Sequence, residues 1–305
     1  MGSLDVTVLV NPRAGRGRAN ATAEQVAGIL RQRGVRVTVP TVQSAEVARA
    51  SAAESVQRGD AGVVAIGGDG MCHLSVQELA GSPTALGIIP AGTGNDFASA
   101  LGLAVDIAGG ARDIAEALTA GGYRSVDLAR CGERWWASVL CAGFDSAVND
   151  RANRMRWPHG PRRYDLALLA ELARLRAVPM TLELGGQTVS LQATLVAVGN
   201  TSTYGGGIPI CPQADVEDGL LDVTVVGRIT RGQLIRMTPS LRGGHHLGHP
   251  SVTTYRASSV SLRVDEGTEV TAYADGEPIA ALPVTAVCQP GALRVLQTAS
   301  EQRAS

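Results

Sequence analysis

The hydrophobic positions in the first 125 residues alternate between short continuous runs and longer amphipathic stretches. The short runs are rich in Val, Ile and Leu, as expected for parallel strands that are buried on both faces. The longer stretches have the length and the capping residues of helices. We predict strands at 6–10, 35–40, 61–68 and 85–92, and helices at 21–34, 44–59 and 71–81. This alternation indicates an α/β domain with a parallel sheet.

The pattern changes near residue 126, beyond which short strands are separated by turns. Gly185 and Gly186 lie between two such strands and predict a β-hairpin. This half is therefore expected to be a mainly antiparallel β-sandwich. One helix, near 162–176, interrupts it, and we expect its leucines, Leu166 and Leu169 among them, to cover the sandwich. We place the domains at 1–125 and 126–290, and expect the tail, 291–305, to return to the first domain.

Composition narrows the class of protein. The chain has 305 residues, 45% of them hydrophobic and 18% charged, which is enough for two domains with sizeable cores. The net charge of -1 gives no reason to expect a nucleic-acid partner. All 27 strongly basic residues are arginine, which excludes mechanisms that need a catalytic lysine.

The expected compartment is the cytoplasm. The five cysteines include no CxxC pair, so neither a disulfide framework nor a zinc site is expected. No apolar run is long enough to span a bilayer. The first strand begins almost at once, so we expect no signal peptide.

Three glycine-rich turns follow predicted strands, at 11–17, 67–70 and 90–96. Parallel sheets bind their ligands at the carboxyl ends of their strands, and backbone N–H groups at a helix start suit a phosphate. An ordinary βα turn is the alternative for the first turn. In the second, "GGDG", Asp69 could hold Mg²⁺ on a nucleotide, face a reacting hydroxyl group or cap the next helix. Asp96 in the third turn could simply be a helix cap.

A long polar loop at 199–226 carries three consecutive glycines and then the acidic stretch "ADVEDGLLD". Asp215 and Asp218, with nearby carbonyl groups, make an oxygen-rich set that suits a hard cation. A solvated acidic turn is the alternative.

Taken in order, "VNPRAGRG", "GGDG", "PAGTGNDFA", "YGGGIPICPQADVEDGLLDV" and "DGEP" resemble the bacterial diacylglycerol kinase family, which is related to the sphingosine and ceramide kinases. The resemblance runs from Val8 to about Pro278. "GGDG" alone also fits NAD kinases and phosphofructokinases, but the last three motifs are specific. The resemblance implies an NAD kinase- or phosphofructokinase-like first domain that binds ATP and Mg²⁺. It also implies transfer of the γ-phosphate to a lipid hydroxyl, with diacylglycerol as the leading acceptor and phosphatidic acid as the product.

The same resemblance implies an ATP pocket formed by the glycine turns and the end of the second strand. Its residues would be Asn11, Pro12, Arg13, Ala14, Gly15, Thr41, Gly67, Gly68, Gly70, Met71, Thr93 and Asn95.

The resemblance further implies catalytic and metal-binding positions. Glu277 matches a general base, and Asp69 would share the proton or organise the catalytic Mg²⁺. Asp127 matches an aspartate that supports the active site. The family's structural Mg²⁺ site corresponds to the carboxylates of Asp215 and Asp218 and the carbonyl group of Leu220.

The residues after "GGDG" depart from the usual family pattern. Met71 replaces a threonine, although apolar residues also occur there in the sphingosine and ceramide kinase branches. Leu74 stands where Glu is expected, and Glu78, one helical turn on, is a candidate substitute. Two alternatives therefore stay open. The acceptor could be another lipid, such as a sphingoid base or a glycolipid precursor, or the chain could be a catalytically impaired nucleotide- or lipid-binding protein.

A lipid acceptor requires contact with a membrane. The segment 154–163 combines arginines with Trp157, a pairing that suits an anionic membrane surface. We therefore expect a peripheral protein that associates transiently with the inner membrane surface and serves phospholipid biosynthesis. A homodimer is a further expectation.

Overall fold

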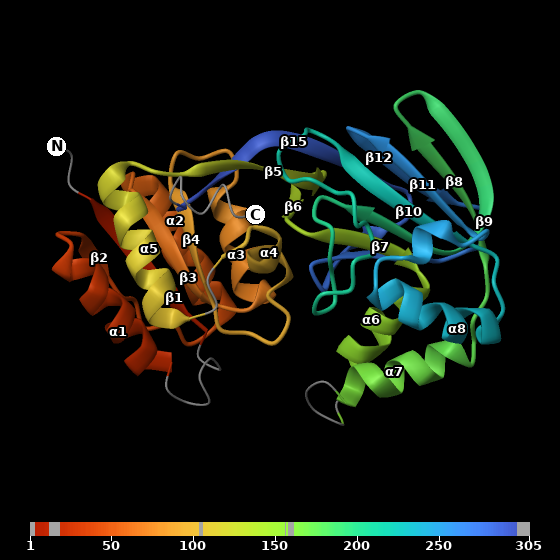
Figure 1. Ribbon diagram of the computed structural model, residues 1–305, viewed down its shortest axis with the longest axis horizontal. Helices are drawn as coiled ribbons and strands as arrows, with labels where there is room; N and C mark the ends of the chain where they lie inside the picture. The colour runs from red at the N-terminus through yellow and green to blue at the C-terminus, as the bar shows by residue number, and fades with distance from the viewer. Residues whose placement is uncertain (1–3, 12–18, 104–105, 156, 158–161, 298–305) are drawn as a thin grey trace. The chain divides into compact units, whose positions relative to one another are not determined.

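The computed structural model describes residues 4–11, 19–103, 106–155, 157 and 162–297. The chain forms two compact units, Met1–Leu128 with Gln289–Ser305, and Ala129–Cys288. The predicted boundaries at 125 and 290 lie within three residues of these. Figure 1 shows the elements of each unit.

The first unit is a parallel sheet with the order β2–β1–β3–β4. Near its end the chain returns, and Val295 at the end of β15 (Val284–Val295) pairs in parallel with Leu86 of β4. The strands are β1 (Asp5–Val10), β2 (Arg36–Thr38), β3 (Gly62–Gly67) and β4 (Ala85–Pro90). The helices are α1 (Ala19–Gln32), α2 (Ala45–Arg58), α3 (Asp69–Leu79), α4 (Asp96–Ala100) and α5 (Ile107–Ala120).

Helices cover this sheet because its strands are apolar on both faces. Val6, Val8 and Val10 of β1 join one buried cluster with α1 and α5 (Figure 1). Helix α2 packs against α3. The side chain of Thr7 in β1 points away from the buried cluster and accepts a hydrogen bond from Arg58 at the end of α2. The α/β domain with a parallel sheet is therefore confirmed. Helix α3 begins two residues before its predicted start.

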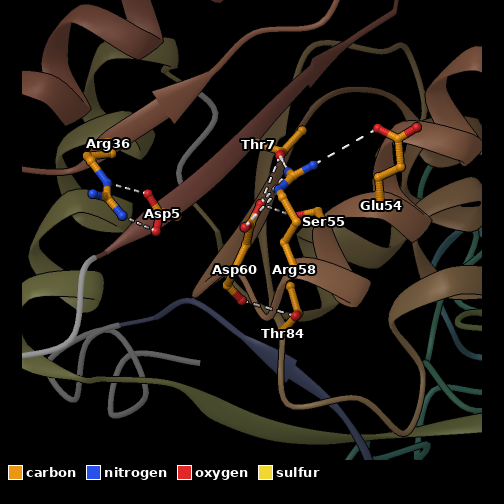
Figure 2. Close-up of polar contacts among 8 residues, drawn as sticks. All are labelled: Asp5, Thr7, Arg36, Glu54, Ser55, Arg58, Asp60 and Thr84. Atoms are coloured by element: carbon orange, nitrogen blue, oxygen red, sulfur yellow. Dashed lines mark hydrogen bonds and ion pairs between the residues drawn. The ribbon is translucent and has the colours of Figure 1, made fainter.

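A buried network ties the amino end of β3 to its neighbours (Figure 2). The carboxylate of Asp60 accepts hydrogen bonds from Thr7 at 3.1 Å, Ser55 at 2.6 Å and Arg58 at 2.7 Å. The hydroxyl of Thr84 donates to the carbonyl of Asp60 at 3.0 Å. Burial would raise the pKa of Asp60, but these hydrogen bonds outweigh burial and lower it. The network lies at the opposite end of β3 from the glycine turn.

The second unit is built from antiparallel pairs. Its strands are β6 (Arg134–Trp136), β7 (Val139–Gly143), β8 (Val178–Leu184), β9 (Gln187–Gly199), β10 (Leu221–Gly227), β11 (Val252–Ala257), β12 (Ser259–Val264), β13 (Thr271–Ala274) and β14 (Glu277–Ala281). Strands β5 (Arg124–Cys131) and β15 run through the two unit boundaries. The antiparallel sandwich is confirmed, and so is the Gly185–Gly186 hairpin, since Leu184 pairs with Gln187.

The prediction of one helix in this half was wrong. Besides α7 (Arg162–Leu172), the unit has α6 (Phe144–Arg154), α8 (Arg231–Arg242) and a short 3-10 helix at His246–Gly248. The expectation that α7 covers the sandwich with its leucines was also wrong. Leu166 and Leu169 are exposed, and within α7 the buried residue is Ala167. Within the described ranges, no helix has both the length and the apolar character to cross a bilayer.

Candidate active site

The turns that follow β3 and β4 meet at the carboxyl edge of the parallel sheet. The N–H group of Ala91 donates to the carbonyl of Gly67 at 2.8 Å. A Cβ atom on Gly92 would stand 2.4 Å from the Cα atom of Gly68, and one on Gly68 would stand 3.0 Å from the Cα atom of Gly92. Because neither position has room for a side chain, the two turns pack backbone against backbone, and the exposed Gly92 leaves bare backbone at the surface.

Asn95 closes the second of these turns. Its side-chain oxygen accepts from the N–H group of Gly92 at 3.0 Å, and its amide group donates to the carbonyl of Gly92 at 3.1 Å. Its backbone has a φ of 58°, a left-handed conformation that asparagine tolerates better than most residues. The side chain of Asn95 therefore holds the shape of this turn. Thr93, inside the closed turn, is exposed.

Asp69 is the first residue of α3, and its N-cap is Gly68, so Asp69 is not the cap of that helix. Its Oδ2 atom accepts from the N–H group of Asn95 at 2.8 Å, and the N–H groups of Asp96 and Phe97 also stabilise its charge. Its Oδ1 atom is buried without a hydrogen-bond partner among the described residues. Burial raises the pKa of Asp69, and the charge of Asp96 raises it further.

Asp96 of the third turn, which the sequence could also explain as a helix cap, is a further candidate residue of this site. It is buried, the N-cap of α4 is Asn95, and a Cβ atom on Gly94 would lie 2.5 Å from Asp69 Oδ2 and 3.5 Å from Asp96 Oδ2. Two carboxylates in close proximity repel each other unless a cation lies between them. The orphaned oxygen of Asp69 and this second carboxylate therefore fit a hard cation such as Mg²⁺.

The remaining predicted nucleotide residues lie in different surroundings. Asn11 lies beside Gly67, and its N–H group donates to the carbonyl of Ile66 at 3.0 Å. Gly70 is exposed, and a Cβ atom on it would have no neighbour within 4 Å. Thr41 is exposed between β2 and α2, and among the described residues no hydrogen bond or ion pair links it to these turns. Four further candidates lie outside the described residues: Pro12, Arg13, Ala14 and Gly15.

The residues after "GGDG" fill the core beneath the turn. Met71 is buried, and a Cβ atom on Gly67 would stand 2.5 Å from its Cγ atom. Met71 therefore supports Gly67 from below. Leu74 is half-buried. Glu78 forms an ion pair with Arg49 about 14 Å along the helix from Asp69, so it is poorly placed to replace a carboxylate at position 74.

Asp127 is buried in β5, where its Oδ1 atom accepts from the N–H group of Gly291 at 2.8 Å. The contact ties β5 to the returning strand β15. The predicted supporting role of Asp127 in the active site stays a prediction.

Glu277 begins β14, and its side chain is exposed. The preceding turn has positive φ values at Asp275 (52°) and Gly276 (82°). Both carboxylate oxygens of Asp275 accept backbone N–H groups at 2.9 Å, from Ala137 and Ser138. Asp275 therefore clamps the turn that carries Glu277 onto the segment before β7, a role that the sequence analysis missed.

The acidic turn before β10 stabilises itself with its own backbone. Asp215 accepts from the N–H group of Glu217 at 3.0 Å, and Asp218 from that of Leu220 at 2.9 Å. The other oxygen of Asp218 accepts from Arg256, which also donates to Asp222 at 3.1 Å. The oxygen donors suit Mg²⁺ in kind, but a cation there must compete with the Arg256 guanidinium for Asp218. The predicted metal site stays a prediction.

A second carboxyl group of interest, Asp145, was not predicted. It lies in the first turn of α6, and the hydroxyl of Tyr204 donates to it. Burial raises the pKa of Asp145 to about 6 and also raises that of Tyr204. The pair ties the start of the glycine-rich segment 204–208 to α6.

Comparison with known proteins finds one family model for each half of the chain. Residues 5–131 match the diacylglycerol kinase catalytic domain, and residues 138–297 match the YegS C-terminal NAD kinase beta sandwich-like domain.

Relatives and solved structures match nearly the whole chain. A diacylglycerol kinase of Mycobacterium tuberculosis is 43% identical over 298 residues, which are 96% of this chain and 94% of that protein. A protein of Stenotrophomonas maltophilia with the name "Probable lipid kinase YegS-like" is 29% identical, over 92% of this chain and 93% of that protein. A crystal structure from Bacillus anthracis str. Sterne has a TM-score of 0.80 at 23% identity, covering 97% of this chain and 96% of that one. At this identity the structural likeness supports the fold alone.

Proposed function

Since the chain belongs to the diacylglycerol kinase family and is a lipid kinase, we propose that it transfers the γ-phosphate of ATP to the hydroxyl group of diacylglycerol. The product is phosphatidic acid. The observation that carries the proposal is the buried, unpartnered Oδ1 atom of Asp69 beside Asp96, at a surface of bare glycine backbone. A phosphate chain with its divalent cation has the charge and the shape that such a surface accommodates.

The first unit would hold the nucleotide. Gly68 and Gly92 let the phosphates approach the backbone, and Asn95 keeps that backbone in shape. Asp69 and Asp96 would hold Mg²⁺, which when bound neutralises the phosphate oxygens. Arginines would supply the remaining positive charge, because the chain has no lysine.

The second unit would supply the base. Glu277 accepts the proton of the lipid hydroxyl, the hydroxyl oxygen bonds to the γ-phosphorus, and the bond from that phosphorus to ADP breaks. Such transfer depends mainly on positioning and charge neutralisation. The clamp from Asp275 to the N–H groups of Ala137 and Ser138 supports this role, because it holds the turn that presents Glu277. Asp215, Asp218 and the carbonyl group of Leu220 would hold a second, structural Mg²⁺.

The proposed setting follows from the acceptor. Diacylglycerol resides in membranes, so the protein would act peripherally at the inner membrane surface and contribute to phospholipid biosynthesis. A homodimer stays a prediction.

The test is transfer of labelled γ-phosphate from Mg-ATP to lipids in mixed micelles. We expect labelling of diacylglycerol, and loss of that labelling in Asp69→Asn and in Glu277→Gln. Two matched acid-to-amide controls, Glu24→Gln and Glu183→Gln, change exposed ion pairs away from the proposed residues and should keep activity. Labelling of a sphingoid base or a glycolipid precursor instead would change the acceptor. ATP binding without labelling of any lipid would indicate the impaired protein and overturn the proposal.

A further inference from the structure

Large exposed apolar side chains gather on one part of the second unit. Among the described residues, eight large hydrophobic side chains are exposed, and six of them belong to α7, to α8 or to the segment before α7: Trp157, Tyr164, Leu166, Leu168, Leu169 and Ile235. Scattered single residues of this kind are normal, but a concentration marks an interaction surface.

Helix α7 carries most of this apolar surface on its outer side. Ala167 is buried, and α7 packs against α6. Leu169 is about 200° around the helix from Ala167, and 62% of it is exposed. Its apolar side therefore faces solvent, the reverse of what a helix that stabilises its own domain presents.

Helix α8 extends the surface. Arg231 at its start donates to the carbonyl of Ala173, just beyond the end of α7, so the two helices meet at these ends. Ile235 of α8 is 57% exposed. We call the exposed side chains of Arg162–Leu172 and Arg231–Arg242 the α7–α8 face.

The charges on this face select its occupant. The two helices contain five arginines: Arg162, Arg163, Arg231, Arg236 and Arg242. They contain two acidic residues, Asp165 and Glu171, and Glu171 is paired with Arg151. A solvent-facing apolar stripe among surplus arginines matches the boundary between anionic headgroups and acyl chains.

We propose that the α7–α8 face docks this protein on an anionic lipid bilayer, with Leu169 and Ile235 entering the acyl boundary and the arginines contacting headgroup phosphates. The inference deepens the proposed function, because it names the surface through which a kinase of membrane lipids meets its membrane. Docking does not require ATP, an acceptor or turnover. It can therefore succeed or fail independently of the kinase reaction.

The test is co-sedimentation of the full chain with vesicles that contain no diacylglycerol, and without ATP. One set is phosphatidylcholine alone, and the other mixes it equally with phosphatidylglycerol. We expect binding to the mixed vesicles that weakens as salt rises. Leu169→Ser combined with Ile235→Ser should lower the partition coefficient about tenfold or more. Replacing Arg236 by Gln should lower it about fivefold.

A matched control separates this face from general apolar exposure. Val47 is also exposed, but on α2 of the first unit. Val47→Ser should leave vesicle binding unchanged. The Leu169 and Ile235 double variant should keep the wild-type Tm, which shows that it is folded without relying on the kinase reaction.

Two results would overturn the proposal: unchanged vesicle binding by the double variant, and equal binding to neutral and anionic vesicles. If the unchanged binding comes with a fall in molar mass of the double variant, the face is a contact between copies of the chain. If docking behaves as expected but no lipid is phosphorylated, the proposed function fails and the docking surface stands.

Discussion

Adding one methyl group at Gly92 should separate the two turns of the candidate nucleotide site. The Cβ atom of Gly92→Ala would lie 2.4 Å from the Cα atom of Gly68 and 2.9 Å from the side-chain oxygen of Asn95. Carbon atoms in ordinary contact are at least about 3.5 Å apart, so the turns must move apart by ~1 Å. The shortest contact is to the backbone of Gly68, so a change of side-chain rotamer cannot absorb the movement.

The cost can be worked from these contacts. Overpacking of this kind costs about 1–3 kcal/mol, and weakening the hydrogen bond from Ala91 to Gly67 adds about 1 kcal/mol. The smaller entropy of unfolded alanine offsets about 0.5–1 kcal/mol. The free energy of unfolding should fall by about 2 kcal/mol, which lowers Tm by about 4–8 °C for a unit of this size.

Calorimetry compares the Tm of Gly92→Ala with that of the control variant Gly70→Ala. Gly70 lies in the first turn of α3, and a Cβ atom there has no neighbour within 4 Å, so Gly70→Ala should keep or slightly raise Tm. ATP titration supplies the second readout. Gly92→Ala should weaken ATP binding at least about tenfold, because Asn95 and the N–H groups that it orders move with the turn. If Gly92→Ala keeps the Tm and the ATP affinity of the wild type, the two turns do not pack as described.

Three further changes test other parts of the chain. Asp60→Asn should destabilise the first unit by about 2–4 kcal/mol at pH 7, because an amide cannot accept all the donors that surround this carboxylate. The pKa of Asp60 is lowered in the folded protein, so its contribution is complete above the unfolded pKa of about 4 and is lost as pH falls through the lower folded value. Urea unfolding at pH 7 and in acid should show the gap closing, and a constant gap would contradict the network. Asp275→Ala should lower kcat about a hundredfold with little change in the KM for ATP, because the turn that presents Glu277 loses its clamp. Asp275→Gly keeps the positive φ but not the clamp, so its kcat should fall by as much. An active Asp275→Gly would show that only the backbone conformation matters. Arg256→Met should raise the affinity of the acidic turn for Mg²⁺ about fivefold, because the guanidinium that competes for Asp218 is removed and its attraction to that carboxylate is worth ~1 kcal/mol. Calorimetric titration without nucleotide measures it, and an unchanged affinity would show that the guanidinium does not compete there.

The first unit could be predicted closely because its strands and helices follow regular periods. The runs around β1, β3 and β4 are apolar without interruption, and α2 has a Ser44 cap and ends at Gly59, whose φ is 71°. Burial on both faces of a parallel sheet leaves that pattern in the sequence. The hairpin at Gly185–Gly186 was equally clear, because such a turn needs positive φ at both central residues.

The missed helices have weaker patterns for physical reasons. The buried residues of α6 are Ser146, Val148 and Ala152, which are small and hardly mark an apolar face. In α8, Met237 alone is buried and Pro239 lies inside the helix. The leucines of α7 follow an ordinary amphipathic spacing, but that spacing cannot say whether the apolar side faces a core or a partner outside the chain.

Two residues show how much of a site can be recognised from sequence alone. Among the described residues, the non-glycine positions with positive φ are Asn95 and Asp275, and each shapes the backbone next to a candidate functional carboxylate, Asp69 and Glu277 respectively. Left-handed backbone costs free energy at such positions and persists where the surroundings hold it in place. Here the side chains themselves supply the holding contacts, to Gly92 in one turn and to two backbone N–H groups in the other. "GND" and "DG" are turn signals that can be read from the sequence, but the N–H groups that each side chain accepts can be read only from the fold. For Asp275 these come from residues more than 130 positions away. Motif matching therefore proposed a role for Glu277 but none for the aspartate that holds its turn.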